Sequence, residues 1–169
     1  MPAVVRFRLD DRAVAARTAL RDGLATAGLP VTTVTPHVTV AAAGTIGKPA
    51  RDALVAELRL VALPALWLAT LGSVTWDDEA LVIAAVTDPE VLAVHTAVHD
   101  ALAGRVRGPH AAHLPGSWLP HVVLATARPA EAFGRLHPVP PVRAGIVAVE
   151  LHDSRTGETD VLRSSAAVR

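Results

Sequence analysis

A duplicated pattern constrains the fold of this chain more than any other feature of its sequence. Residues 18–25 read TALRDGLA and residues 96–103 read TAVHDALA, with five of the eight positions identical. Each copy follows an apolar run that ends in aspartate, Asp10 before the first copy and Asp88 before the second. Because aspartate caps helix N-termini well, each copy is expected to lie in a helix that follows a strand. The sequence therefore predicts strand–helix–strand twice.

The hydrophobic pattern along the rest of the chain predicts further short strands and helices. Segment 104–116, rich in glycine, proline and histidine, is expected to be a loop. All 169 residues are expected to form one domain, with approximate half-copies at 1–78 and 79–169. Strands are expected at 4–9, 31–43 with an interruption at Pro36, 66–76, 80–87, 118–126, 143–152 and 159–163, and helices at 13–27, 48–60, 88–103 and 129–136.

Each predicted repeat leads to a histidine motif at the start of a strand. The first motif reads PHVTV and the second PHVVL, and their histidines, His37 and His121, are 84 residues apart. This separation is close to the 78-residue offset between the two helical copies. Because alternate residues of a strand share a face, His37 projects with Thr39, and His121 with Val123. If the halves are related by a pseudo-two-fold axis, the two imidazoles face each other across a cleft.

Two facing histidines suit the hydrolysis or ring opening of a phosphodiester. That reaction needs a base to activate the nucleophile and an acid to protonate the leaving oxygen. Histidine titrates near neutrality, so one member of the pair can be neutral while the other is cationic. A neighbouring hydroxyl group can donate a hydrogen bond to a non-bridging phosphate oxygen. This chemistry requires no metal ion or other cofactor, and none is expected.

On these residues the chain resembles the two-histidine (2H) phosphoesterase superfamily, which carries two H-Φ-T/S-Φ tetrapeptides about 80 residues apart, where Φ is apolar. The superfamily includes bacterial 2'-5' RNA ligase-like (LigT-like) proteins and 2',3'-cyclic nucleotide phosphodiesterases. The resemblance implies an α+β fold of two pseudo-symmetric lobes, each an antiparallel sheet with flanking helices, around a central cleft. It implies that His37 and His121 are the catalytic acid and base, that Thr39 binds phosphate, and that the partner is a nucleotide or a short RNA end.

The second motif departs from the pattern of the superfamily, because Val123 stands where threonine or serine is usual. Valine is nearly isosteric with threonine but cannot donate a hydrogen bond. Losing one hydrogen bond to a charged oxygen costs about 1.5–3 kcal/mol, which is roughly ten- to a hundredfold in rate. Two functions therefore stay open. One is an enzyme acting on a 2',3'-cyclic phosphate or a 2'-5' linkage, and the other is a module that binds a nucleotide or RNA end without turnover.

Four further residues are candidates for substrate binding. Arg6 and Arg8 share one face of the first strand, and they are expected either to meet a phosphate or to pair with carboxylates in solvent. Trp118 is expected either to stack on a base or to pack in the core. Arg128 stands two places after the position where many members of the superfamily carry a basic residue, and Thr126 occupies that position here.

Two other histidines offer a third hypothesis, a zinc hydrolase. His95 and His99 are four residues apart on a predicted helix, a spacing that a metal ion can use. No HExxH motif is present, and both positions fall at the margin of the apolar stripe of the helix. We therefore expect both to lie on a solvated helix face, and we expect no metal site.

Composition excludes several classes of protein and partner. Sixteen basic and 16 acidic residues give a formal net charge of zero, which removes the attraction that drives non-specific binding of long duplex nucleic acid. The absence of cysteine excludes thiol catalysis and disulfides. The N-terminal sequence lacks the apolar region of a signal peptide, and the longest uncharged stretch, 60–74, is shorter than the roughly 20 residues that span a bilayer. A cytoplasmic monomer without membrane contact is expected.

Overall fold

A single antiparallel sheet connects the strands of the protein in the computed structural model, which describes residues 2–75 and 79–165. The strand order is β5-β2-β1-β7-β3-β4-β6, and β8 pairs with β7 beside this path. Every strand pair is antiparallel. The strands are β1 (Ala3–Leu9), β2 (His37–Thr45), β3 (Ala65–Val74), β4 (Ala80–Val86), β5 (Arg107–Pro109), β6 (His121–Ala125), β7 (Val142–Asp153) and β8 (Thr159–Ser164).

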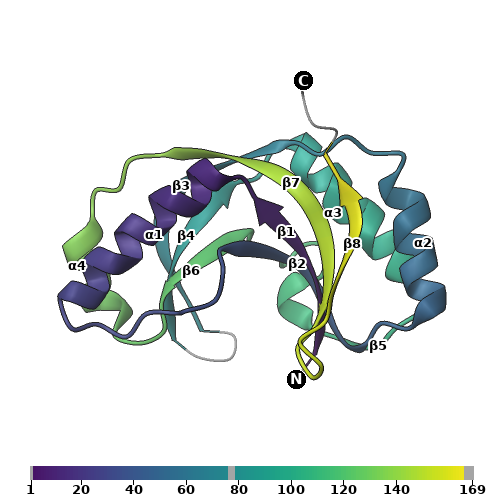
Figure 1. Ribbon diagram of the computed structural model, residues 1–169, viewed down its shortest axis with the longest axis horizontal. Helices are drawn as coiled ribbons and strands as arrows, with labels where there is room; N and C mark the ends of the chain where they lie inside the picture. Colours follow the sequence, from purple (N-terminus) through teal and green to yellow (C-terminus); the bar gives the residue numbers. More distant parts are fainter. Residues whose placement is uncertain (1, 76–78, 166–169) are drawn as a thin grey trace.

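The long strand β7 makes the sheet continuous and curves across the whole molecule (Figure 1). Its residues 142–145 pair with β3, and its residues 146–153 pair with β1. Four strands separate β2 from β6 in the sheet order, yet the sheet curves so far that β2 and β6 come into contact. The two strands that begin with the motif histidines are therefore neighbours in space.

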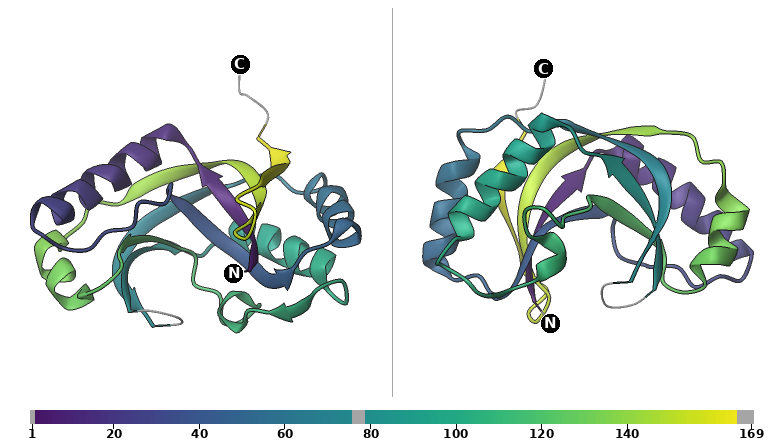
Figure 2. Two further views of the ribbon diagram at one scale, coloured as in Figure 1. Left: turned by 60° about the horizontal axis from the view of Figure 1, so that its bottom comes forward. Right: turned by 180° about the vertical axis from the view of Figure 1, so that it is seen from behind.

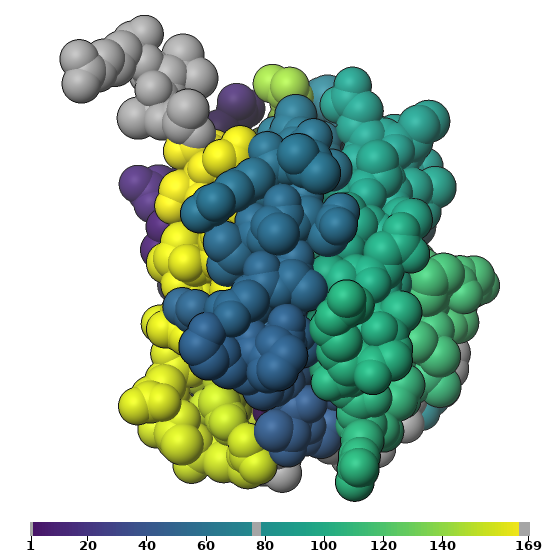
Figure 3. All heavy atoms as spheres, turned by 90° about the vertical axis from the view of Figure 1, so that its right-hand side faces the viewer, coloured from purple at the N-terminus to yellow at the C-terminus, as the bar shows by residue number. Residues whose placement is uncertain are grey.

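The helices lie in two pairs at the two ends of the sheet (Figures 1 and 2). At one end α1 packs against α4, and at the other end α2 packs against α3. Figure 3 shows α2 and α3 side by side on the outer surface, with β8 next to α2. The helices are α1 (Asp11–Thr26), α2 (Lys48–Leu58), α3 (Pro89–Leu102) and α4 (Pro129–Leu136), with one 3-10 turn, η1 (Ala111–His113).

Local sequence explains where the two repeated helices begin. The Asp10 carboxylate accepts a hydrogen bond from the Ala13 amide at 2.8 Å, and the Asp88 carboxylate accepts one from the Val91 amide at 2.9 Å. These matched N-caps confirm the start predicted for each helix. Asp10 also accepts a hydrogen bond from the Gly145 amide at 2.6 Å, which ties the start of α1 to β7.

The two halves of the sequence interleave in the structure. Helix α1 from the first half packs against β6 from the second half, and α3 from the second half packs against β2 from the first half. The connecting loops cross in the same way, since Val31 bridges to Ala125 of β6 and β5 pairs with β2. Each motif strand is therefore supported by the helix of the other repeat.

One core joins the sheet to both helix pairs. In β1 the residues alternate between buried and more exposed positions, which places Val5, Phe7 and Leu9 in the core and Arg6 and Arg8 on the opposite face. None of the helices within residues 2–75 and 79–165 is both long and apolar enough to cross a membrane.

The structure confirms the predicted α+β class with antiparallel strands and flanking helices, and it corrects several boundaries. The strand predicted at 31–43 begins only at His37, because residues before it form a loop that ends in Pro36. The strand predicted at 118–126 likewise begins at His121, after Pro120, which lacks a backbone N–H. The predicted loop 104–116 contains both β5 and η1. The predicted strand end and turn at 76–78 lie outside the described residues.

Candidate active site

A cavity of about 300 Å³ lies between β2 and β6, and both motif histidines line it. The residues that share a strand face with them, Thr39 and Val123, line it as well. The other lining residues are Arg17, Thr32, Val34, Thr35, Pro36, Val122 and Thr126. His37 lines the cavity with Thr39, and His121 lines it with Val123, which are the two same-face pairs that strand periodicity predicted.

A second cavity, of about 380 Å³, adjoins the first and shares His37 with it. Arg6 and Arg8 of β1 line this second cavity together with Glu150 of β7. Its other lining residues are Thr35, Pro36, Thr159 and Val161. His37 therefore stands between the cavity that holds the histidine pair and a cavity lined by charged residues.

The two motif histidines have the same hydrogen-bond arrangement. Nδ1 of His37 lies 2.8 Å from the carbonyl oxygen of Thr35, and Nδ1 of His121 lies 2.7 Å from the carbonyl oxygen of Leu119. A carbonyl oxygen only accepts hydrogen bonds, so Nδ1 must carry the proton in each neutral ring. Nε2 is then the nitrogen with a free lone pair on both rings.

Burial lowers the pKa of both histidines below the ordinary value of 6.5. The carbonyl bonds to Thr35 and Leu119 oppose this effect by favouring the protonated ring. The pKa of His37 is lowered further by the positive charges of Arg6 and Arg17 and by His152. The neutral form, with Nε2 unprotonated, is therefore favoured near neutral pH at both histidines.

The strand beside the first motif carries charge. In the pairing of β1 with β2, Arg8 lies opposite His37 and Arg6 lies opposite Thr39. Arg6 Nε lies 3.1 Å from Glu150 Oε2, and Arg8 Nη1 lies 3.2 Å from Glu150 Oε1. Glu150 is only 5% exposed, so the carboxylate that pairs with both arginines is buried rather than solvated. The structure thus places both predicted arginines in the wall next to His37, already paired with an acidic group.

The strand beside the second motif is apolar. In the pairing of β4 with β6, Ala84 lies opposite His121 and Val82 lies opposite Val123. Val82 is fully buried, and Ala84 is nearly so. The backbone of the site is pseudo-symmetric, but the neighbouring strand carries arginines beside the first motif and apolar side chains beside the second.

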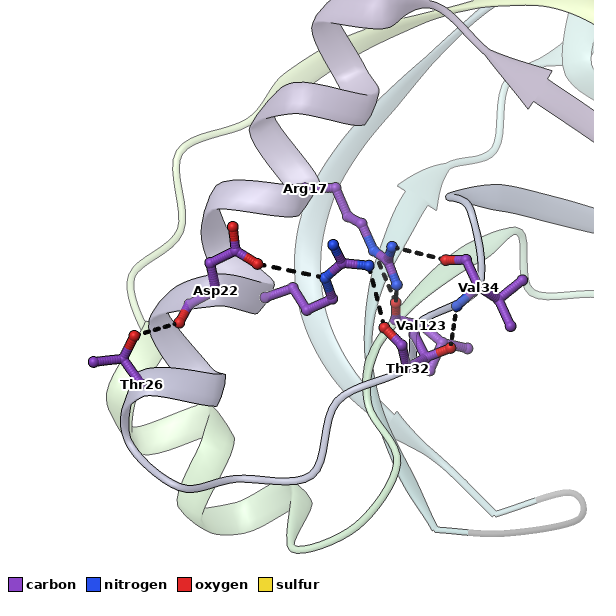
Figure 4. A network of polar contacts seen from close by, with 7 residues as sticks. Arg17, Asp22, Thr26, Thr32, Val34 and Val123 are labelled. Carbon is purple, nitrogen blue, oxygen red and sulfur yellow. Dashed lines mark hydrogen bonds and ion pairs between the residues drawn. The ribbon is translucent and has the colours of Figure 1, made fainter.

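The sequence-based prediction missed Arg17, a residue of α1 that lines the first cavity. It is 2% exposed and donates from Nε to the carbonyl oxygen of Val123 at 3.0 Å, with a further bond from Nη2 to the same oxygen. Nη1 donates to the carbonyl oxygen of Val34 at 3.3 Å (Figure 4). Burial, with a smaller effect from Arg21, lowers the pKa of Arg17 to about 10, so it remains charged at neutral pH. A charged residue on the buried stripe of α1, with Ala13 and Leu24, was the available signal.

The structure does not bring Trp118 or Arg128 to either cavity described above. The indole Nε1 of Trp118 donates to the carbonyl oxygen of Thr39 at 2.8 Å, and its ring stacks on His95 with a centroid separation of 4.1 Å. Trp118 therefore packs against the core, which is the second of its two predicted roles, and it bonds to the backbone of the first motif. Arg128 is exposed and bonds to Glu131 and to the carbonyl oxygen of Gly28.

The predicted solvation of His95 is wrong. Its side chain lies between α3 and the loop that leads to β6, is 2% exposed, and makes a contact of 2.9 Å with the carbonyl oxygen of His113. His99 Nε2 lies 3.3 Å from the carbonyl oxygen of Val40. Within the part of the chain that the structure describes, no three metal-ligating side chains gather in one place.

Comparison with known proteins gives a match by structure only. The sequence matches no family model and no curated protein. E. coli LigT in its apo form matches with a TM-score of 0.58 at 13% identity, over 95% of this chain and 92% of LigT. LigT complexed with 3'-AMP matches with a TM-score of 0.55 at 15% identity, over 95% and 93%. TT0787 of Thermus thermophilus matches with a TM-score of 0.60 at 19% identity, over 98% and 97%. The chain therefore has the same fold as E. coli LigT, as the resemblance carried by its two motifs implied.

Proposed function

We propose that this chain is a phosphoesterase that acts on a 2',3'-cyclic phosphate or a 2'-5' phosphodiester, with His37 and His121 as general acid and base. The observation that supports this proposal most strongly is the pair of imidazoles that line one cavity. Nδ1 of each ring bonds to a backbone carbonyl oxygen, which leaves the lone pair of Nε2 free in the neutral ring. E. coli LigT, which has the same fold, is known in a complex with 3'-AMP. That complex supports a nucleotide or a short RNA end as the substrate. The proposal includes a cytoplasmic monomer that does not bind long duplexes.

Ring opening of a 2',3'-cyclic phosphate would use the two Nε2 atoms in opposite protonation states. The neutral histidine takes a proton from water as the water oxygen bonds to phosphorus. The protonated histidine gives its proton to the ribose oxygen as the phosphorus–oxygen bond breaks. In the ligation direction the same two groups exchange roles. The Thr39 hydroxyl donates a hydrogen bond to a non-bridging phosphate oxygen, where negative charge accumulates.

Incubation of the purified protein with 2',3'-cyclic nucleotides tests the proposal, with chromatography to separate 2'- from 3'-phosphate products. His37→Ala and His121→Ala are each expected to lower turnover by about 10²–10⁴-fold, the usual contribution of a general acid or base. His137→Ala is the matched control, because His137 stacks on Phe133 at the end of α4 and lines neither cavity. Retained turnover in either motif variant, or no turnover of any cyclic nucleotide by the wild type, would contradict the proposal.

The apolar side chains at Val123 and on the neighbouring strand favour one alternative, a nucleotide-binding module with little or no turnover. Val123 offers no hydroxyl to the phosphate, and its cross-strand neighbour Val82 offers no polar group. Calorimetry with 3'-AMP beside the product assay separates the two functions. Measurable affinity without turnover would support the binding module, above all if Val123→Thr created turnover. Turnover in the wild type would exclude it.

A further inference from the structure

Arg17 is a buried cation without an acidic partner among residues 2–75 and 79–165. The charged side chain that acts on it most is another arginine, Arg21, and its three hydrogen bonds all go to backbone carbonyl oxygens. A buried charge is costly unless an opposite charge compensates it. Carbonyl dipoles satisfy part of the guanidinium but do not neutralise it. The position of Arg17 in the wall of the first cavity places this uncompensated charge where a ligand can reach it.

The Arg17 guanidinium also has more N–H donors than its hydrogen bonds use. An arginine carries five N–H groups in a fixed plane. The Nε–H and one N–H of Nη2 bond to Val123, and one N–H of Nη1 bonds to Val34. One N–H on each of Nη1 and Nη2 has no protein acceptor in the described part of the chain. Two N–H groups of one guanidinium match the spacing of two phosphate oxygens.

The hydrogen bonds of Arg17 attach it to the second motif, as a bond from Trp118 attaches that residue to the first. On the first side, the indole of Trp118 donates to the carbonyl oxygen of Thr39. On the second side, Arg17 donates to the carbonyl oxygen of Val123, the residue equivalent to Thr39. The first motif thus combines a hydroxyl group with a neutral indole donor. The second motif combines a methyl group with a cation.

We infer that Arg17 is a phosphate-binding residue, and that it supplies to the second motif the contact that a hydroxyl at Val123 would make. This inference rests on the proposed function and names the group that holds the phosphate of a nucleotide on the His121 side of the cavity. Because Arg17 also lowers the pKa of His37, it lies within electrostatic reach of the first motif as well. A phosphate between the two histidines would therefore neutralise the buried charge.

Calorimetry with 3'-AMP and with adenosine tests the inference. Arg17→Met is expected to weaken 3'-AMP binding by about 10- to 100-fold, the value of a charge-assisted hydrogen bond, and to leave adenosine binding within about twofold. Arg21→Met is the matched control. Arg21 is a guanidinium one turn further along α1 that bonds to the loop at Thr32 without lining the cavity, so its loss should change neither affinity by more than about twofold.

A double-mutant cycle separates phosphate binding from a merely structural role. If Arg17 replaces the missing hydroxyl, Arg17→Met should weaken 3'-AMP binding by no more than about threefold in a Val123→Thr background. Equal losses in both backgrounds, or equal losses for 3'-AMP and adenosine, would overturn the inference. If Arg17→Met does not fold, nitrogen-15 NMR of the wild type decides. The Nε–H resonance of Arg17, assigned with Arg17→Lys, should shift on addition of inorganic phosphate, and an unchanged resonance would overturn the inference.

The two proposals fail in different ways. If the wild type bound no 3'-AMP and opened no cyclic nucleotide, the proposed function would fall and this inference with it. If the wild type bound 3'-AMP and lost turnover on substitution of His37 or His121, but Arg17→Met bound 3'-AMP like the wild type, only this inference would fall.

Discussion

Glu150→Gln is expected to destabilise the protein by about 3 kcal/mol, because it leaves a nearly buried cation without its partner. The Arg6 Nε to Glu150 Oε2 distance is 3.1 Å, and the two side chains are 16% and 7% exposed. At an effective dielectric constant of about 20, charges at this distance attract by about 5 kcal/mol before desolvation is subtracted. Breaking a buried pair costs about 3–5 kcal/mol, and glutamine still accepts one hydrogen bond, which places the expected value at the lower end. Arg8 adds little, since its side chain is 49% exposed.

Urea unfolding at neutral pH measures this cost, and the chain contains a matched control. Asp160 lies 3.0 Å from Arg51, but these side chains are 57% and 40% exposed. Asp160→Asn should therefore cost less than about 1 kcal/mol, although the two ion pairs have nearly the same length. In a double-mutant cycle, Arg6→Met with Glu150→Gln should cost at least about 1 kcal/mol less than the sum of the single changes.

The same substitution has an electrostatic consequence for the site. Without the carboxylate, the charge of Arg6 acts on His37 without compensation, so the pKa of His37 should fall further. An NMR titration of the His37 ring measures this shift, and the ring of His121, whose pKa has no contribution from Arg6, serves as the reference. A stability loss for Glu150→Gln no larger than that for Asp160→Asn, or a rise in the pKa of His37, would show that Glu150 does not neutralise the wall of the site.

Two further predictions concern stability. Burial lowers the pKa of His95 to about 4. Between about pH 6.5 and pH 4 the unfolded chain therefore binds a proton at this residue that the native protein does not bind. The free energy of unfolding should fall by about 3 kcal/mol as the pH is lowered through this window. Urea unfolding across that range should show most of this loss disappearing in His95→Gln; an unchanged loss would contradict the assignment. Asp10→Ala should lower the free energy of unfolding by about 2 kcal/mol, and Asp88→Ala by about 1 kcal/mol. The difference arises because Asp10 accepts a hydrogen bond from the Gly145 amide as well as from its own helix, whereas, in the described part of the chain, Asp88 caps its helix alone. Equal unfolding midpoints for the two variants would contradict this.

The sequence was sufficient to predict the pairing of the two motifs, because that pairing follows from local rules repeated twice. Asp10 and Asp88 cap their helices through contacts three residues away, which any window of the sequence contains. The alternation of a strand then places His37 with Thr39 on one face. With a pseudo-two-fold axis assumed between the two copies, these local rules also place the two motif strands next to each other.

The sequence was not sufficient for the electrostatics of the site, because each charged group finds its partner far along the chain. Glu150 is 144 residues from Arg6, and the carbonyl oxygen of Val123 is 106 residues from Arg17. Nothing near these residues indicates such partners. Trp118 shows the same limit, since the contacts that decide between its two predicted roles include a bond to Thr39, 79 residues away.

Register explains why the repeat offset does not reveal the chemical asymmetry of the cleft. The helices repeat at 78 residues, which would match Arg6 with Ala84. The sheet instead matches Ala84 with Arg8, since Arg8 lies opposite His37 and Ala84 lies opposite His121. The repeated unit thus places both motif histidines at one cavity, while the neighbouring strands determine the charge beside each motif. Arg6 and Arg8 lie beside the first motif and Arg17 bonds to the second, so under the two proposals a phosphate between the histidines meets the Thr39 hydroxyl on one side and the Arg17 guanidinium on the other.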